Sequence, residues 1–213
     1  MTIEKSLAGI DILKKLGISI NFGFMLFQPS STFRSICENL DFLKRICSDG
    51  YTPVTFLKMM PYYETLIEKD LIKEGRLKIS RGIRDYDFHE KWMDDYYKFT
   101  VASFMKWLRY PDGLESTSHW TRNHFSVYLH FCDYFNNDVL KLSRRFRKII
   151  SESNIFLLDM MNELLLFFSS GQYKRENASL DKYSENIDLK HDYFLQRVKG
   201  IMNELMLYAE ICR

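Results

Sequence analysis

Three histidines and one cysteine that lie close together in the chain are the side chains best suited to bind a metal ion. They are His119, His124, His130 and Cys132. Metal ligands on one helix converge when they are three or four residues apart, whereas the gaps here are five, six and two residues. The pattern therefore favours ordinary polar or partly buried side chains, and we predict no metal ligands.

The cysteines as a group do not have the spacing of a metal or cluster site. They are Cys37, Cys47, Cys132 and Cys212. No two of them lie within the two-to-four-residue spacing that is typical of zinc or iron–sulfur ligands. We predict that they are reduced and mostly buried, because free cysteine behaves as a small apolar residue.

A basic run is the clearest candidate for an anion-binding surface. It consists of Arg144, Arg145, Arg147 and Lys148. A nucleic acid or a phosphate could bind such a run, but a solvated helix face or a contact with a protein partner is the commoner role. The sequence has no phosphate-binding loop, dinucleotide fingerprint or nucleophile elbow. Because no acid–base pair stands out either, we predict no catalytic residues.

One stretch, Ile18–Pro61, has the pattern of strand, helix and strand. Apolar runs at Ile18–Phe27 and Thr52–Met60 flank an amphipathic segment, Thr32–Cys47. Two apolar strands joined through a helix predict a βαβ unit with parallel, buried strands. In such units ligands bind at the loops that follow the strands, here residues 28–32 and 59–65.

The rest of the chain is predicted to be helical, apart from two polar segments. A helix over Met1–Leu16 precedes the βαβ stretch, which is unusual for a complete doubly wound or barrel domain. The expected later elements are a helix at Leu66–Lys73, a charged connector at Arg76–Asp87, helices at Trp92–Leu108, Trp120–Phe135 and Asp138–Ser170 (the last with a break near Ser151–Asn154), a mobile loop at Gln172–Asp188 and a final helix at Leu189–Cys212. We predict two regions, 1–87 and 88–213.

Length and composition set the class of protein. The 213 residues are 46% hydrophobic and 27% charged, which is typical of a globular chain. The formal net charge of +2 favours neither nucleic-acid nor membrane binding. The most apolar run, Ile155–Phe168, is too short and too polar to span a bilayer, and the amino terminus does not resemble a signal peptide. We therefore expect a cytoplasmic protein without nucleic-acid or membrane partners.

The central stretch resembles part of a known enzyme family, the radical S-adenosylmethionine enzymes, and among them the group with a cobalamin-binding domain ahead of the barrel. The matching segments are Gly17–Phe33, Glu38–Leu43, Pro53–Tyr62, Glu64–Glu68 and Leu71–Leu77. In order and spacing they are similar to the fifth strand, the helix after it, the sixth strand and its loop. The resemblance reaches to about Tyr110, and the helical remainder is only loosely similar to the family's variable carboxyl-terminal extensions.

The resemblance implies a partial (β/α) barrel of two parallel strands, followed by an all-helical region. It also implies that the strand ends face S-adenosylmethionine. Matched by position, the residues that would flank or approach this cofactor are Phe24, Phe27, Pro29, Lys58, Met59 and Met60. Aromatic and methionine side chains suit a flat adenine ring.

The family's three-cysteine motif for the iron–sulfur cluster is absent from this sequence, as are the first four strands of the barrel. The resemblance therefore implies a carboxyl-terminal, substrate-side portion that is not catalytic alone. It would need a protein partner, or a missing amino-terminal half, that carries the cluster. The alternative is a stand-alone helical interaction module, or an accessory subunit, built on a degenerate barrel fragment.

Overall fold

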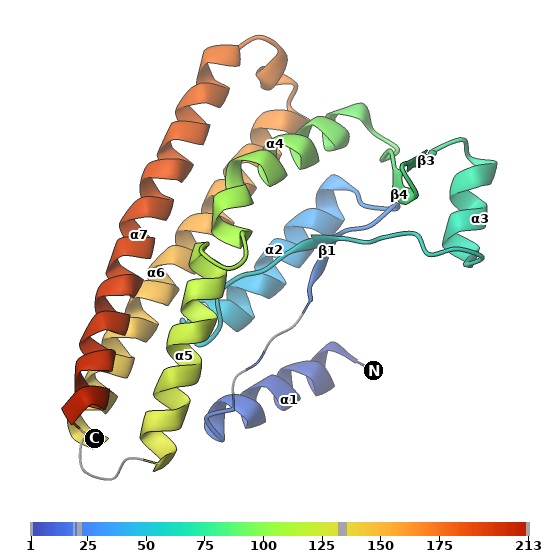
Figure 1. Ribbon diagram of the computed structural model, residues 1–213. Coiled ribbons are helices and arrows are strands. Elements are labelled where there is room, and N and C mark those ends of the chain that lie inside the picture. Colours follow the sequence, from blue (N-terminus) through green and yellow to red (C-terminus); the bar gives the residue numbers. More distant parts are fainter. Residues whose placement is uncertain (1, 19, 21–22, 132–135, 212–213) are drawn as a thin grey trace.

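The computed structural model describes residues 2–18, 20, 23–131 and 136–211. The fold is mostly helical, with two sheets of two strands each, as Figure 1 shows. The elements are α1 (Ile3–Lys15), β1 (Met25–Phe27), α2 (Phe33–Cys47), β2 (Leu57–Lys58), α3 (Leu66–Lys73), β3 (Leu77–Ser80), β4 (Ile83–Tyr86), α4 (Lys91–Leu108), α5 (Leu114–Phe131), α6 (Asn136–Ser169), a 3-10 turn (Gln172–Lys174) and α7 (Asn177–Ile211). The predicted pair of parallel strands is present, but the described residues do not form a partial barrel.

The predicted order of strand, helix and strand is confirmed, although both strands are shorter than expected. Strand β1 pairs in parallel with β2, and Met25 lies opposite Leu57. Helix α2 begins after Thr32, whose hydroxyl accepts a hydrogen bond from the Ser35 amide while the Ser35 hydroxyl accepts one from the Thr32 amide. Ahead of the second strand, the Val54 amide donates a hydrogen bond to the Asn154 side chain of α6.

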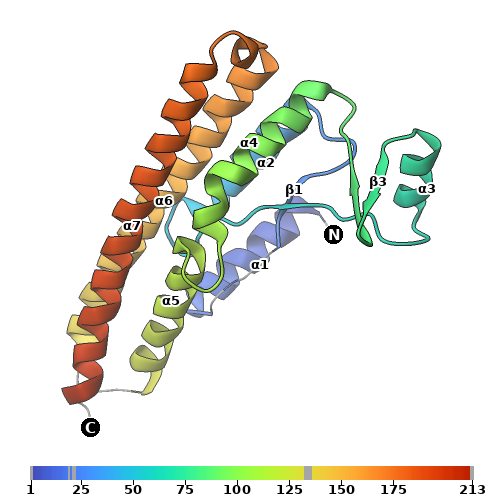
Figure 2. The same ribbon diagram turned by 45° about the horizontal axis from the view of Figure 1, so that its top comes forward.

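The prediction of a charged connector at Arg76–Asp87 is wrong, because these residues form the β3–β4 hairpin. Arg81 and Gly82 have φ angles of 50° and 78°, and two positive φ values are what a tight type I′ turn requires. In both Figure 1 and Figure 2 this hairpin and α3 lie together at the side of the molecule away from α7. They form a small lobe that is attached to the helices.

The helical region differs from prediction in three places. Helix α5 begins at Leu114 rather than Trp120, and α6 continues without a break through Ser151–Asn154. The prediction of a mobile loop at Gln172–Asp188 is wrong, because this segment forms a 3-10 turn and the first three turns of α7. The polar composition of this segment hid the apolar side of α7, where Ile187 is buried. The carboxyl end of the predicted Trp120–Phe135 helix lies outside the described residues.

Helix α6 is the centre of the fold, since it contacts α2, α4, α5 and α7. Buried side chains from residues 1–87 and 88–213 form a single hydrophobic cluster, so the two predicted regions share one core. The turn after α2 is fastened to α6 by Asn154, which is 2% exposed. Its amide nitrogen donates to the carbonyl oxygens of Cys47 (2.7 Å) and Thr52 (2.8 Å), and its oxygen accepts from the Val54 amide (2.9 Å).

No helix in the described part of the chain has an apolar stretch long enough to cross a membrane.

Candidate functional site

The carboxyl ends of β1 and β2 are where the sequence predicts a cofactor, and Lys58 is the best-defined residue there. Its side chain is 9% exposed. The ammonium nitrogen lies 4.2, 4.5 and 4.9 Å from the ring centroids of Tyr86, Tyr97 and Phe88. It also donates to the Tyr86 carbonyl oxygen (2.8 Å) and pairs with Asp85. The ammonium group is thus held by an aromatic box and two oxygen atoms of the chain itself.

Phe27 lies in the core next to this box. It is fully buried, and its ring contacts those of Phe56, Phe88, Tyr96 and Tyr97 at centroid distances of 5.0 to 6.2 Å. Its carbonyl oxygen accepts hydrogen bonds from the Tyr86 hydroxyl (3.1 Å) and the Met59 amide (2.8 Å). These contacts join β1, β2, the hairpin and α4, and in this arrangement the Phe27 side chain is a packing residue.

Pro29, Met59 and Met60 complete the rim. The Pro29 carbonyl oxygen accepts a hydrogen bond of 3.0 Å from Arg76, which also donates to the Asp87 carbonyl oxygen. Met59 is partly buried, whereas the Met60 side chain is 52% exposed. Of the rim residues predicted from the sequence, Met60 is therefore the most accessible to a ligand or partner.

Phe24 lies apart from the other predicted site residues, in an apolar groove between α1 and the α2–β1 layer. Its ring stacks on Phe42 with a centroid distance of 5.7 Å. The groove has a volume of about 440 Å³ and is lined mostly by apolar atoms, including those of Ile10, Leu13 and Ile46. Helix α1 contributes no buried residues, so it covers this groove loosely.

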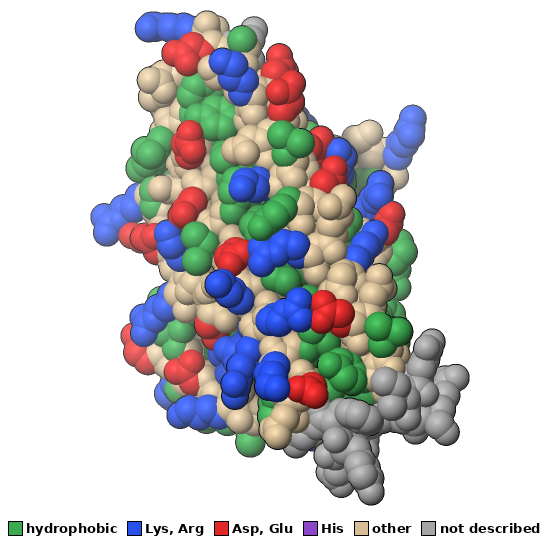
Figure 3. Space-filling view, turned by 90° about the vertical axis from the view of Figure 1, so that its left-hand side faces the viewer, with side chains coloured by type: hydrophobic (Ala, Val, Ile, Leu, Met, Phe, Trp, Pro, Cys, Tyr) green, Lys and Arg blue, Asp and Glu red, His purple; other side chains and the backbone are tan. Residues whose placement is uncertain are grey.

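A basic cleft among α1, α5 and α6 was not predicted. Arg122, Arg147 and Lys14 surround one ring, that of Tyr51, at 4.3, 5.4 and 6.0 Å from its centroid. In the sequence, Arg147 is visible only as part of a basic run on one helix. That run divides, because Arg145 pairs with Glu204 of α7 at 2.7 Å. On the α7 side of the molecule Lys and Arg side chains lie among acidic ones (Figure 3).

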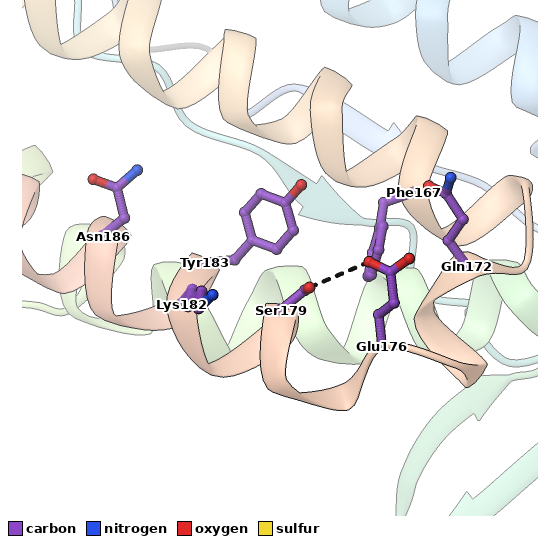
Figure 4. Close-up of a pocket in the computed structure, with 7 residues that line it drawn as sticks. All are labelled: Phe167, Gln172, Glu176, Ser179, Lys182, Tyr183 and Asn186. Carbon is purple, nitrogen blue, oxygen red and sulfur yellow. Dashed lines mark hydrogen bonds between the residues drawn. The ribbon is translucent and has the colours of Figure 1, made fainter.

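A shallow hollow at the α6–α7 connection is shown in Figure 4. Phe167, Gln172, Glu176, Ser179, Lys182, Tyr183 and Asn186 line it. The Ser179 hydroxyl donates to Glu176 at 3.3 Å, and the Tyr183 hydroxyl donates to Glu163 at 2.8 Å. Burial and Glu163 raise the pKa of Tyr183 to about 12. The Ser179 and Tyr183 hydroxyl groups are therefore each hydrogen-bonded to a carboxylate.

The histidines of α5 do not converge on a common point. The ring nitrogen Nδ1 of His124 hydrogen-bonds to the Trp120 carbonyl oxygen, and that of His130 to the Ser126 carbonyl oxygen, both at 2.8 Å. His119 lies 3.1 Å from Glu115 one turn earlier. Among the described residues no group of three or more His, Cys, Asp or Glu side chains is placed to hold a metal ion. Cys132 lies outside those residues.

Comparisons with protein-family models, with curated proteins and with solved structures found no match to this chain.

Proposed function

We propose that the chain is the carboxyl-terminal, substrate-side portion of a radical S-adenosylmethionine protein. The cluster-bearing strands would come from another polypeptide segment, either a separate chain or one that precedes this stretch. The proposal rests on the sequence resemblance and on one observation, the parallel β1–α2–β2 unit with unpaired strand edges. Each strand of this pair has one neighbouring strand among the described residues. Strand edges of this kind bind further strands readily.

The surface beside the unpaired strand edges is apolar, so another protein segment could pack against it. Met25 and Leu57, paired side by side in the two strands, are 47% and 52% exposed. The apolar groove beneath α1 lies next to β1 and ends at Phe24. A strand and a helix added beside β1 would cover these apolar surfaces and would extend the pair toward a barrel.

In the proposed assembly this chain positions a substrate and the cofactor but does not cleave the cofactor. The iron–sulfur cluster would supply the electron for that cleavage, and its three-cysteine motif is not in this sequence. The exposed residue Met60 and the Pro29 loop would face the shared site at the ends of the strands. Lys58 would act indirectly, because its ammonium group is enclosed by the box of Tyr86, Phe88 and Tyr97.

A second candidate function, a stand-alone interaction module, is favoured by a different observation. Phe27 and Phe56 contact aromatic residues of α4, namely Tyr96, Tyr97 and Phe104. This face of the strand pair is therefore already filled by the chain's own helical region. A protein that had lost the barrel could keep the strand pair as a support for its helices.

Co-expression with a cluster-bearing polypeptide encoded beside this one separates the two candidates. We expect the two chains to purify together and the complex to contain iron and to bind S-adenosylmethionine. Met25→Lys should abolish association, because it places a charge at the strand edge. The matched control is Met105→Lys on α4, where the methionine has a similar exposure of 53%.

Two results would count against the first candidate. If the isolated chain neither associates with the cluster-bearing polypeptide nor binds S-adenosylmethionine, the interaction module is the better description. If the isolated chain assembles an iron–sulfur cluster by itself, the interpretation of its cysteines is wrong.

A further inference from the structure

The basic cleft brings together side chains from four separate segments. Lys14 and Lys15 come from the end of α1, Tyr51 from the turn after α2, Arg122 from α5 and Arg147 from α6. The cleft has a volume of about 250 Å³. Its floor includes the apolar side chains of Phe125, Leu129, Leu140 and Phe146. It therefore offers positive charge at one part and an apolar surface beside it.

Positive charge in the cleft exceeds negative charge. Four cationic side chains line it, and the nearby carboxylate, Asp49, is already used by Lys14 at 2.8 Å. No ion pair of Arg122 or Arg147 is found among the described residues, although Asp49 lies close enough to Arg122 to favour its charged form. Four cations less the one carboxylate Asp49 give a local charge of +3, compared with a formal net charge of +2 for the whole chain. A cluster in which positive charges outnumber negative ones attracts anions.

Arg122 is the central group, because it is charged, 7% exposed and bonded to neutral acceptors. Its two terminal nitrogens donate to the Thr52 hydroxyl (3.1 Å) and the Gly50 carbonyl oxygen (3.4 Å). Burial, with a contribution from Arg147, lowers the pKa of Arg122 to about 10, so the guanidinium stays charged at neutral pH. Burying a charge without an opposite charge is costly, and a bound anion would offset that cost.

The turn that carries Tyr51 is held firmly against α6. The Gly50 turn lies directly on α6, since a Cβ atom at Gly50 would be only 1.9 Å from the Arg147 carbonyl oxygen. Asn154 and the contact at Gly50 thus fix the position of Tyr51. The Tyr51 ring lies against the guanidinium groups of Arg122 and Arg147. Groups held in place in this way lose little entropy when they bind a ligand.

We propose that this cleft binds a small organic phosphate that carries at least two negative charges. Arg122 and Arg147 would contact the phosphate, since guanidinium groups match phosphate oxygens through paired hydrogen bonds. Lys15 would add charge from α1. The apolar floor at Phe125 and Phe146 would contact the uncharged part of the ligand. This site is independent of the strand ends and of the proposed function.

The test is calorimetric titration of the intact chain with pyrophosphate and, separately, with ADP at low salt. We expect saturable binding of both that weakens as salt is added. Arg147→Gln should weaken binding by about tenfold, because it removes one charge-assisted contact to phosphate. Lys15→Gln should weaken it less. Arg147 and Lys15 are both exposed, so these variants should fold.

Arg144→Gln is the matched control, since Arg144 is exposed on the same helix but does not line the cleft. It should leave affinity within about twofold of the original protein. Tighter binding of ADP than of pyrophosphate would support use of the apolar floor by an organic ligand. Equal affinity would overturn that part and leave a site for free phosphate. The absence of saturable binding at millimolar concentrations, or equal losses in the Arg144 and Arg147 variants, would overturn the whole proposal.

Discussion

Replacement of Asn154 by alanine is the sharpest test of how the two halves of this protein are joined. The side chain is 2% exposed and makes three hydrogen bonds to backbone groups. After truncation the Cys47 carbonyl oxygen keeps a second bond, from the Gly50 amide at 3.0 Å. The Val54 amide and the Thr52 carbonyl oxygen keep no other partner among the described residues.

The expected loss follows from those three groups. A buried backbone group left without a partner costs about 1–3 kcal/mol, and a lost bond with a remaining alternative costs about 1 kcal/mol. Two such groups and one lost bond give a decrease of about 3–7 kcal/mol in the free energy of unfolding. That is a large part of the 5–15 kcal/mol that is usual for a folded domain.

The assay is unfolding in guanidinium chloride, followed by the circular dichroism of the helices. The transition midpoint should fall while the slope of free energy against denaturant stays the same. Asn162→Ala, an exposed position on the same helix, should change stability by no more than about 0.5 kcal/mol.

Asn154→Asp separates the donor from the acceptor function of the amide. The aspartate can still accept from the Val54 amide, but its carboxylate faces the two carbonyl oxygens. It should therefore be more damaging at pH 7 than at pH 4, where a protonated carboxyl can donate one hydrogen bond. If Asn154→Ala lost less than about 1 kcal/mol, the joint between the α2–β2 turn and α6 would not be what holds the halves together.

Three further predictions concern other contacts. Gly50→Ala should lower the free energy of unfolding by more than about 2 kcal/mol, because φ is +70° and the Cβ atom would collide with α6. Denaturant unfolding measures this loss. The control is Gly75→Ala, which has a similar φ but open space around the Cβ atom and should lower the free energy of unfolding less. Lys58→Met should lose about 2 kcal/mol in the same assay, since it fills the aromatic box without the charge-assisted bonds. Burial raises the pKa of the Cys47 thiol from 9.0 to about 12, so the folded state favours the neutral thiol. The stabilisation that comes from this raised pKa is fully present below pH 9 and is lost as the pH rises toward 12. Cys47→Ala should therefore reduce the loss of stability that thermal unfolding measures at alkaline pH.

Local signals in the sequence predicted the elements whose ends are set by nearby residues. Helix α3 has the expected bounds, because the Thr65 hydroxyl caps its first turn and Gly75, with a φ of +69°, ends it. Thr32 sets the start of α2 in the same way. The start of α7 was missed because its polar residues resemble a loop, and its packing depends on α6, which lies elsewhere in the sequence.

The two parts of the candidate site differ in how far sequence could predict them. The rim residues of β1 and β2 follow from the strand pattern, but the box around Lys58 needs Tyr86 and Tyr97 from a hairpin and a helix that were not linked to it. The basic cleft depends on Lys14, Tyr51 and Arg122, which are distant in the chain. A run of like charges on one helix is visible in a sequence, whereas a cluster formed by tertiary packing is not.

The joint at Asn154 has a consequence for how the protein is made. Asn154 follows its partner Thr52 by 102 residues. A ribosome adds about 5–20 residues per second, so the second strand leaves the ribosome roughly 5–20 s before α6 can cover it. During that time Val54 and Phe56, which are buried in the finished fold, are open to aggregation. Yield in the cell should therefore depend on the speed of translation between the two segments and on the chaperones that meet the nascent chain.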